Sequence, residues 1–236
     1  MTDLFEVIDA TWPAASTRLA GGFKVREGLG GGSRVSTASL EVPLDEADID
    51  AAVAAHRALG QLPKFIVRPG EAALDAALAG RGFELFDPVT LFTAPIAALP
   101  SDVPPVTAFA HWPPLAITRE VWSEGEIGPE RQAVAERAAG PKAAVLGRTS
   151  DRAAGAGFVA IHDGVAMLHA LEVLPAFRRR GLARAIMAEA VRWAGGEGAE
   201  TFALVVRSAN APAIALYTAL SMVPAGNYHY RREPAA

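Results

Sequence analysis

The sequence predicts an α/β protein built from two related halves, on three observations. After residue 140, apolar and alternating segments predict three strands, a long helix, a strand, a short helix and a last strand. Residues 65–83 resemble residues 204–222 at a constant offset of 139. Seven prolines fall within the 27 residues from Pro88 to Pro114, which places a border near residue 99. We therefore expect an N-terminal half, 1–98, and a second domain, 99–236.

Composition narrows the class of protein. The chain has 236 residues, 51% of them hydrophobic and 20% charged, which is typical of a folded protein with a proper core. Its first residues, "MTDLFEVIDATWP", are acidic where a signal peptide is basic, and no apolar run is long enough to span a membrane, so we expect a cytoplasmic protein. A net charge of -4 argues against nucleic-acid binding. The absence of cysteine excludes disulfides, thiolate zinc sites and a cysteine nucleophile, and we expect no metal.

A proline-rich connection and two helices are predicted around the border and at the start of the second domain. The proline-rich stretch predicts a connection around at most one short strand, at "VTLF". "ITREVWSEG" and "GPERQAVAERAAG" predict helices, the second with Pro129 in its first turn and Gly140 at its end.

The rest of the second domain alternates strands and helices. "AAVLGRTS", "GAGFVAIH" and "GVAMLHALEV" predict strands, and Asp163-Gly164 suits the tight hairpin between the last two. A helix is predicted from Leu182 to Ala194, followed by a strand at "TFALVVR", a short helix from Pro212 to Leu220 and a strand near "NYHYRR".

The internal repeat aligns chemically different residues. "LEVPL" at residue 40 resembles "LEVLP" at residue 171 with an offset of 131, so the first half lacks eight residues that would include an arginine-glycine loop. At the offset of 139, Glu71 aligns with Asn210 and Leu78 with Tyr217. The first half thus resembles a copy that lacks the polar residues of the second half. Chance similarity between alanine-rich helices is the alternative.

The loop "FRRRGLA" joins a strand to the long helix. The first amides of a helix lack internal partners and lie at the positive end of its dipole, so they bind an anion if backbone can approach. Gly181 permits that approach, and the arginines add charge suited to a pyrophosphate; a solvated basic face is the alternative. The other glycine-rich segment, Gly28 to Ser33, lacks the ending of a nucleotide-binding loop and predicts a hairpin turn.

The run "LEVLPAFRRRGLARAIMAEAV", with Asn210 and Tyr217 after it, resembles the GCN5-related N-acetyltransferases (GNAT), whose hallmark is Arg/Gln-x-x-Gly-x-Gly/Ala. The resemblance covers about residues 105 to 236; "GGFKVREGLGGGSRV" resembles, more weakly, the first part of two-part members. It implies a GNAT fold, a mixed, mostly antiparallel sheet flanked by helices. It also implies direct attack of a primary amine on acetyl-CoA in a ternary complex. "LSMV", residues 220–223, departs from the family's Leu-Gly-Phe ending.

By this resemblance, the loop holds the coenzyme A pyrophosphate, the Val173 amide stabilises the oxyanion, Asn210 binds the pantetheine amides, and Tyr217 is the general acid. The residues expected to bind the cofactor are Leu171, Val173, Arg178, Arg179, Arg180, Gly181, Leu182, Ala183, Asn210 and Ala213.

Two residues compete for the role of general base. His169 matches a histidine in a similar "LHAL" stretch of the arylalkylamine acetyltransferases, but a packed core histidine is the alternative. Glu172 is either a rival base or a salt-bridge partner of a loop arginine. Strand alternation predicts Glu172 on the face opposite His169, with Leu171 and Val173 on the same face as His169.

The acceptor, a small-molecule or peptide amine, is the least specified part. The resemblance nominates Trp112, Trp122, Glu126, Ile127 and Tyr228 as its pocket, with Tyr230 as a further candidate. The alternative function is a non-catalytic acyl-CoA-binding regulatory protein. We expect a monomer or a homodimer.

Overall fold

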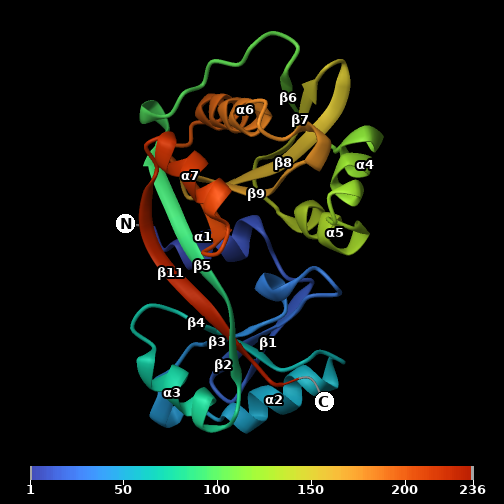
Figure 1. The fold of residues 1–236 in the computed structure, drawn as a ribbon. Coiled ribbons are helices and arrows are strands. Elements are labelled where there is room, and N and C mark those ends of the chain that lie inside the picture. Colours follow the sequence, from blue (N-terminus) through green and yellow to red (C-terminus); the bar gives the residue numbers. More distant parts are fainter. Residues whose placement is uncertain (1, 235–236) are drawn as a thin grey trace. The chain divides into compact units, whose positions relative to one another are not determined.

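The structure is a computed structural model that describes residues 2–234, and these form two compact units (Figure 1). Unit 1 comprises the chain up to Pro13, Leu91–Val205 and Ala211–Pro224. Unit 2 comprises Ala14–Thr90, Val206–Asn210 and the chain from Ala225 onwards. The units interleave along the chain, so they do not test the border near residue 99, which separates similar sequences and remains a prediction.

Unit 1 holds the predicted strands and helices of the second half except the last strand and the end of the strand before it. Its elements are α1 (Leu4–Thr11), β6 (Ala108–His111), α4 (Ala116–Glu124), α5 (Pro129–Arg137), β7 (Lys142–Thr149), β8 (Arg152–His162), β9 (Val165–Val173), α6 (Leu182–Gly196), most of β10 (Thr201–Arg207) and α7 (Ala211–Ala219). The strands lie in the order β6-β7-β8-β9-β10, antiparallel except for the parallel pair β9–β10.

Unit 2 repeats this plan on a smaller scale. Its elements are β1 (Ser16–Ala20), β2 (Phe23–Glu27), β3 (Ala38–Leu40), α2 (Ile49–Ala58), β4 (Lys64–Val67) and α3 (Ala72–Gly80). Short 3-10 turns occur in the chain at Ser33–Val35, Leu44–Glu46, Ile96–Ala98 and Pro175–Phe177. The core contains Phe23, Phe65 and Phe83, with Phe65 edge-on to both neighbouring rings.

Two long strands belong to both units, β5 (Glu84–Pro95) and β11 (Val223–Arg232). The prediction of at most one short strand at "VTLF" is wrong, because β5 has 12 residues and contains Pro88. Proline removes only a donor, and the Pro88 carbonyl still accepts a hydrogen bond from the Ser208 amide at 2.7 Å. In unit 2, β11 pairs antiparallel with β4, from His229 opposite Val67 to Arg232 opposite Lys64.

The sequence repeat corresponds to equivalent elements. Helix α3 begins at Ala72 and α7 at Ala211, so the offset of 139 is kept, and each follows a strand that pairs in parallel with an earlier one. Gly28 to Ser33 lies in the connection between the antiparallel strands β2 and β3, as predicted. The Asp163-Gly164 hairpin is confirmed, with φ of 47° and 73°.

The elements that were not predicted include the N-terminal helix α1 and the short strand β6. Asp3 caps α1 by accepting a hydrogen bond from the Phe5 amide at 2.9 Å. Helix α7 ends without the family's glycine, since Ser221 adopts a φ of 62° at its exit. Across residues 2–234, every helix is too short or too polar to cross a membrane.

Candidate functional site

The start of α6 is an uncapped helix end. Gly181 is the N-cap residue, with φ 81° and ψ 0°, and no side chain accepts a hydrogen bond from the first turn there. A left-handed φ favours glycine, and without a Cβ the amides of the first turn stay accessible. Arg179 is also left-handed, at φ 64°. The loop therefore presents backbone donors at the positive end of a 15-residue helix.

Strand β9 contains a bulge directly before this loop. His169 lies opposite Phe158 and Glu172 lies opposite Ala156, so Ala170 and Leu171 together oppose the single residue Gly157. Ala170 adopts a φ of 50°, which is unfavourable for a residue with a Cβ. The Trp122 indole stabilises the bulge by donating a hydrogen bond to the Ala170 carbonyl at 2.9 Å.

The bulge corrects the predicted faces of β9. Because Phe158 and Ala156 are two residues apart on β8, their partners His169 and Glu172 lie on one face, not on opposite faces. Leu171 lies on the other face, where a Cβ on Gly157 would contact its Cδ1 at 3.8 Å and Ile186 of α6 at 3.2 Å. The prediction from simple alternation is wrong because one extra residue reverses the alternation beyond it.

The pairing of β9 with β10 ends at the bulge. Its last pair is Leu204 with Leu168, although β9 continues to Val173. Beyond Leu168 the edge of β9 that faced β10 is no longer paired with it. A strand edge of this kind binds an extended, amide-containing chain through backbone hydrogen bonds.

Two of the loop arginines, Arg178 and Arg180, have different surroundings. Arg178 donates from Nη2 to Glu172 Oε1 at 2.9 Å and from Nε to the Val173 carbonyl at 2.7 Å, so the salt bridge considered for Glu172 is present. Arg180 lies over the Phe177 ring, 5.7 Å from its centroid, and near Ser150.

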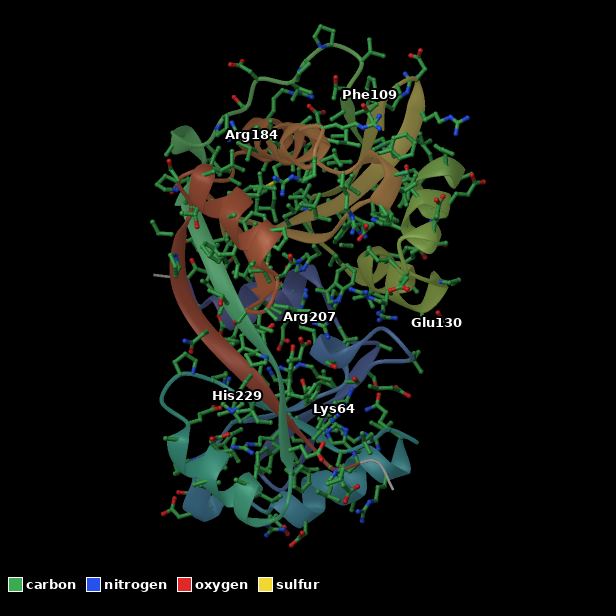
Figure 2. The ribbon with its side chains drawn as sticks, in the orientation of Figure 1. Lys64, Phe109, Glu130, Arg184, Arg207 and His229 are labelled. Atoms are coloured by element: carbon green, nitrogen blue, oxygen red, sulfur yellow. The ribbon has the colours of Figure 1, made fainter. Side chains whose placement is uncertain are left out.

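A cavity of about 660 Å³ lies beside the start of α6. Its walls are the loop Pro100–Thr107, the turn Arg148–Asp151 and the α6 residues from Gly181 to Ala188, with Arg184 labelled in Figure 2. Three arginines and two aspartates line it: Arg148, Arg180, Arg184, Asp102 and Asp151. Its volume suits a small organic ligand, and its charge balance favours an anionic one.

His169 is enclosed in unit 1. It is 3% exposed, its ring stacks on Trp12 at 5.0 Å, and its Nε2 lies 2.9 Å from Thr11 Oγ1. The Thr11 hydroxyl donates its only hydrogen to the Val7 carbonyl at 2.6 Å. His169 Nε2 therefore carries the proton and donates, which leaves Nδ1 as the basic nitrogen of the neutral ring.

Tyr217 lies in α7 and is 6% exposed, with its ring 5.8 Å from that of Phe92. Burial raises the pKa of Tyr217 to about 12, because the phenolate would lose its hydration. The phenol stays protonated at neutral pH, so it can donate a hydrogen bond or act as an acid and cannot act as a phenolate base. Asn210 belongs to unit 2 and Ala213 to unit 1, on either side of the start of α7.

The residues nominated for the acceptor pocket differ in burial and belong to two units. Trp122 is 1% exposed and Ile127 is buried, whereas Glu126 and Trp112 are exposed and all four belong to unit 1. Tyr228 belongs to unit 2, where it is buried with Tyr230, the rings 5.4 Å apart and at a steep angle.

Sequence reasoning missed Thr11 and Trp12. These residues end α1 and contact the second half's His169 from the opposite end of the chain, so only an amphipathic pattern over Leu4–Thr11 could have signalled them. It also missed Gly125, whose close contact with Glu172 has no local sequence signal.

Comparisons with known proteins find similarity to one family in this region. Residues 110–222 match the Acetyltransferase (GNAT) family. A GCN5-related N-acetyltransferase from Kribbella flavida has a similar structure, with TM-score 0.71, 18% identity and coverage of 99% of this chain and 95% of that one. A tandem GNAT protein from the clavulanic acid biosynthesis pathway is also similar. Its TM-score is 0.64 at 15% identity, and the match covers 100% of this chain and 90% of that one.

A functionally unknown conserved protein from Staphylococcus epidermidis gives a TM-score of 0.73 at 13% identity, covering 100% of this chain and 98% of that one. No curated protein matches the sequence. At these identities the solved structures show the fold: a large, mixed, mostly antiparallel GNAT sheet flanked by helices, as predicted.

Proposed function

Residues 110–222 match the GNAT acetyltransferase family, and on this basis we propose that the protein is an acetyl-CoA-dependent N-acetyltransferase acting on a primary amine. The observation that carries the proposal is the start of α6 at a glycine N-cap, shortly after the end of β9, which is no longer paired with β10. The first suits a pyrophosphate and the second suits the amides of a pantetheine arm. The amine attacks the thioester directly, in a ternary complex.

Each part of the cofactor has a proposed partner. The loop Arg178–Ala183 holds the pyrophosphate, chiefly through backbone amides, while Leu171 and Val173 supply the strand edge for pantetheine. Asn210 and Ala213 complete the pantetheine contacts at the start of α7. The cavity beside α6 takes the anionic nucleotide end, in keeping with its three arginines.

The chemistry requires a neutral amine, a stabilised oxyanion and a protonated leaving group. At neutral pH, freeing an alkyl ammonium of its proton costs about 4 to 5 kcal/mol, and His169 Nδ1 is the proposed acceptor of that proton. The Val173 amide is the proposed oxyanion donor. Tyr217 donates a hydrogen bond to the sulfur as the thiolate leaves.

Full proton transfer from Tyr217 is unfavourable at that moment. With the pKa of the Tyr217 phenol at about 12 and that of a thiol near 8.5, transfer is uphill by about 5 kcal/mol unless the enclosed thiolate is also made more basic. We therefore assign Tyr217 a strong hydrogen bond first and a late proton transfer.

The chain offers a clean assay, because it has no cysteine and any thiol released from acetyl-CoA is that of coenzyme A. Purified protein is incubated with acetyl-CoA and a panel of primary amines, and free thiol is followed with a chromogenic disulfide reagent. Initial rates that give intersecting double-reciprocal lines support the ternary complex, whereas parallel lines indicate a covalent intermediate.

Two variants test the assignments. Tyr217→Phe should lower turnover and Gly181→Glu should abolish cofactor binding. An observed activity that neither substitution changes would rule these roles out. Coenzyme A that raises the melting temperature without turnover on any amine would instead favour the non-catalytic acyl-CoA-binding protein.

A further inference from the structure

Glu172 is contacted by the cofactor loop on one side. One guanidinium, that of Arg178, binds the carboxylate at 2.9 Å and the neighbouring Val173 carbonyl at 2.7 Å. The side chain of Glu172 is 18% exposed and that of Arg178 is 56% exposed. Arg178 therefore holds the start of the loop against the last residues of β9.

On its other side, Glu172 packs against the end of α4. Gly125 is the C-cap residue of α4, and a Cβ at that position would lie 2.2 Å from Glu172 Cγ and 3.0 Å from Cδ. No substituent fits there unless the Glu172 side chain moves. The backbone between α4 and α5 and the cofactor loop are thus both in contact with one side chain.

We propose that Glu172 is a positioning residue, which holds the cofactor loop through Arg178 and is itself held by Gly125, and that it does not take the proton from the amine. The inference deepens the proposed function and rests on it. A neutral side chain at this position would lose the ion pair with Arg178 and release the loop that the reaction needs. Its effect is on cofactor affinity and not on proton transfer.

Glu172→Gln tests this directly, because glutamine keeps the shape and cannot act as a base. We expect the Kd for coenzyme A and the KM for acetyl-CoA to rise by about fivefold, as for loss of a partly exposed ion pair. We expect kcat to stay within about threefold and the acidic limb of the kcat/KM profile for the amine to keep its midpoint. A loss of kcat of about 100-fold, or a vanished acidic limb, would make Glu172 the base and overturn the proposal.

A double-variant cycle tests the link to Arg178. If the pair acts as a unit, Glu172→Gln combined with Arg178→Gln should weaken coenzyme A binding no more than Arg178→Gln does alone. Losses that multiply would show that the two residues act independently and would overturn the link.

Gly125→Ala tests the other contact without substituting either charged residue. It should raise the Kd for coenzyme A to a similar extent, because the methyl group displaces Glu172. Gly128→Ala is the matched control in the same connection, since its added Cβ meets only the Glu130 carboxylate, at 3.3 Å, and it should leave the Kd unchanged. Equal affinities for the two alanine variants would contradict the proposal.

Amide hydrogen exchange separates this inference from the proposed function. In the free protein, amides of the loop between Leu174 and Leu182 should exchange at least several-fold faster in Glu172→Gln than in the wild type. This readout needs no cofactor. Absence of coenzyme A binding to the wild type would refute the proposed function, whereas unchanged exchange in the variant would refute the role of Glu172.

Discussion

The two halves of the chain each begin their main helix with a different N-cap residue, and the difference separates a candidate anion site from a closed helix end. The N-cap residue of helix α6 is Gly181, which has no side chain to accept a hydrogen bond from the first-turn amides. The N-cap residue of helix α2 is Asp48, whose carboxylate accepts hydrogen bonds from the Asp50 amide at 2.9 Å and the Ala51 amide at 3.1 Å. In the first half, the anion at the helix start is the protein's own carboxylate.

The start of α2 is closely packed by a neighbouring turn, whereas the start of α6 borders a cavity. In unit 2 the turn at Gly21 lies so close to Asp48 that an added Cβ would be 2.3 Å from its carbonyl oxygen. In unit 1 the corresponding turn, between β7 and β8, borders the cavity of about 660 Å³. Related elements can therefore provide a binding site or a packed scaffold, depending on the N-cap residue and on whether the neighbouring turn packs against the helix start.

The strongest test gives α6 the cap of α2. Gly181→Asp should weaken coenzyme A binding by at least about 100-fold, because a fixed negative charge at the helix start repels the pyrophosphate. Gly181→Asn is the matched control: both residues tolerate a left-handed φ, and only the charge differs. Isothermal titration should show a loss of about tenfold for asparagine. Similar affinities for the two variants would mean that backbone shape, not charge, decides binding.

A second test concerns the histidine buried in each half. His56 in unit 2 is fully buried, and no group in the described residues pairs with its Nε2, whereas His169 Nε2 is paired with Thr11. Burial, with a smaller contribution from the charge of Lys64, lowers the pKa of His56 to about 4, although a backbone interaction with Lys64 opposes the shift. The stability contributed by neutral His56 is complete above pH 6.5 and is lost as the pH falls to about 4.

Urea unfolding at several pH values should therefore show unit 2 losing up to about 3 kcal/mol between pH 6.5 and 4. His56→Leu should remove most of this pH dependence. If the variant loses stability with pH as the wild type does, another group is responsible.

A third test concerns the repeat positions Tyr217 and Leu78. Tyr217→Phe should lower kcat by about 10- to 100-fold with little change in the KM for acetyl-CoA, because the hydroxyl acts on the departing sulfur. Leu78→Met, a volume-conserving change in the unit 2 core, should leave kcat unchanged. With a pKa of about 12, ionisation of Tyr217 should cause no loss of wild-type activity between pH 7 and 10. A tyrosine variant with normal kcat would place Tyr217 outside the chemistry.

The smallest expected effect comes from removing the cap of α2. Asp48→Ala should lower the free energy of unfolding by about 1 kcal/mol, and titration should still find one coenzyme A per chain, because the first half also lacks the arginine-glycine loop. Asp45→Ala, in the 3-10 turn before the cap, should change neither quantity measurably. A second binding event in Asp48→Ala would show that the cap alone closes the first half.

The features that could be predicted correctly from the sequence depend on neighbouring residues. Helical periodicity and Pro129 marked the helices, Asp163-Gly164 marked the hairpin, and "FRRRGLA" marked the start of α6, because turn and cap chemistry are local. The repeat aligned α3 with α7 because equivalent helices keep equivalent spacing.

Features that depend on distant residues are visible only in the folded chain. A single extra residue in β9, held by the Trp122 indole, put Glu172 on the face of His169, and no alternation pattern shows a bulge whose stabilising donor is 48 residues away. Thr11 meets His169 across 158 residues, and Pro88 lies within a long strand because the partner of its carbonyl comes from the other half. Such contacts follow from packing between separated segments, and a local pattern carries no record of them.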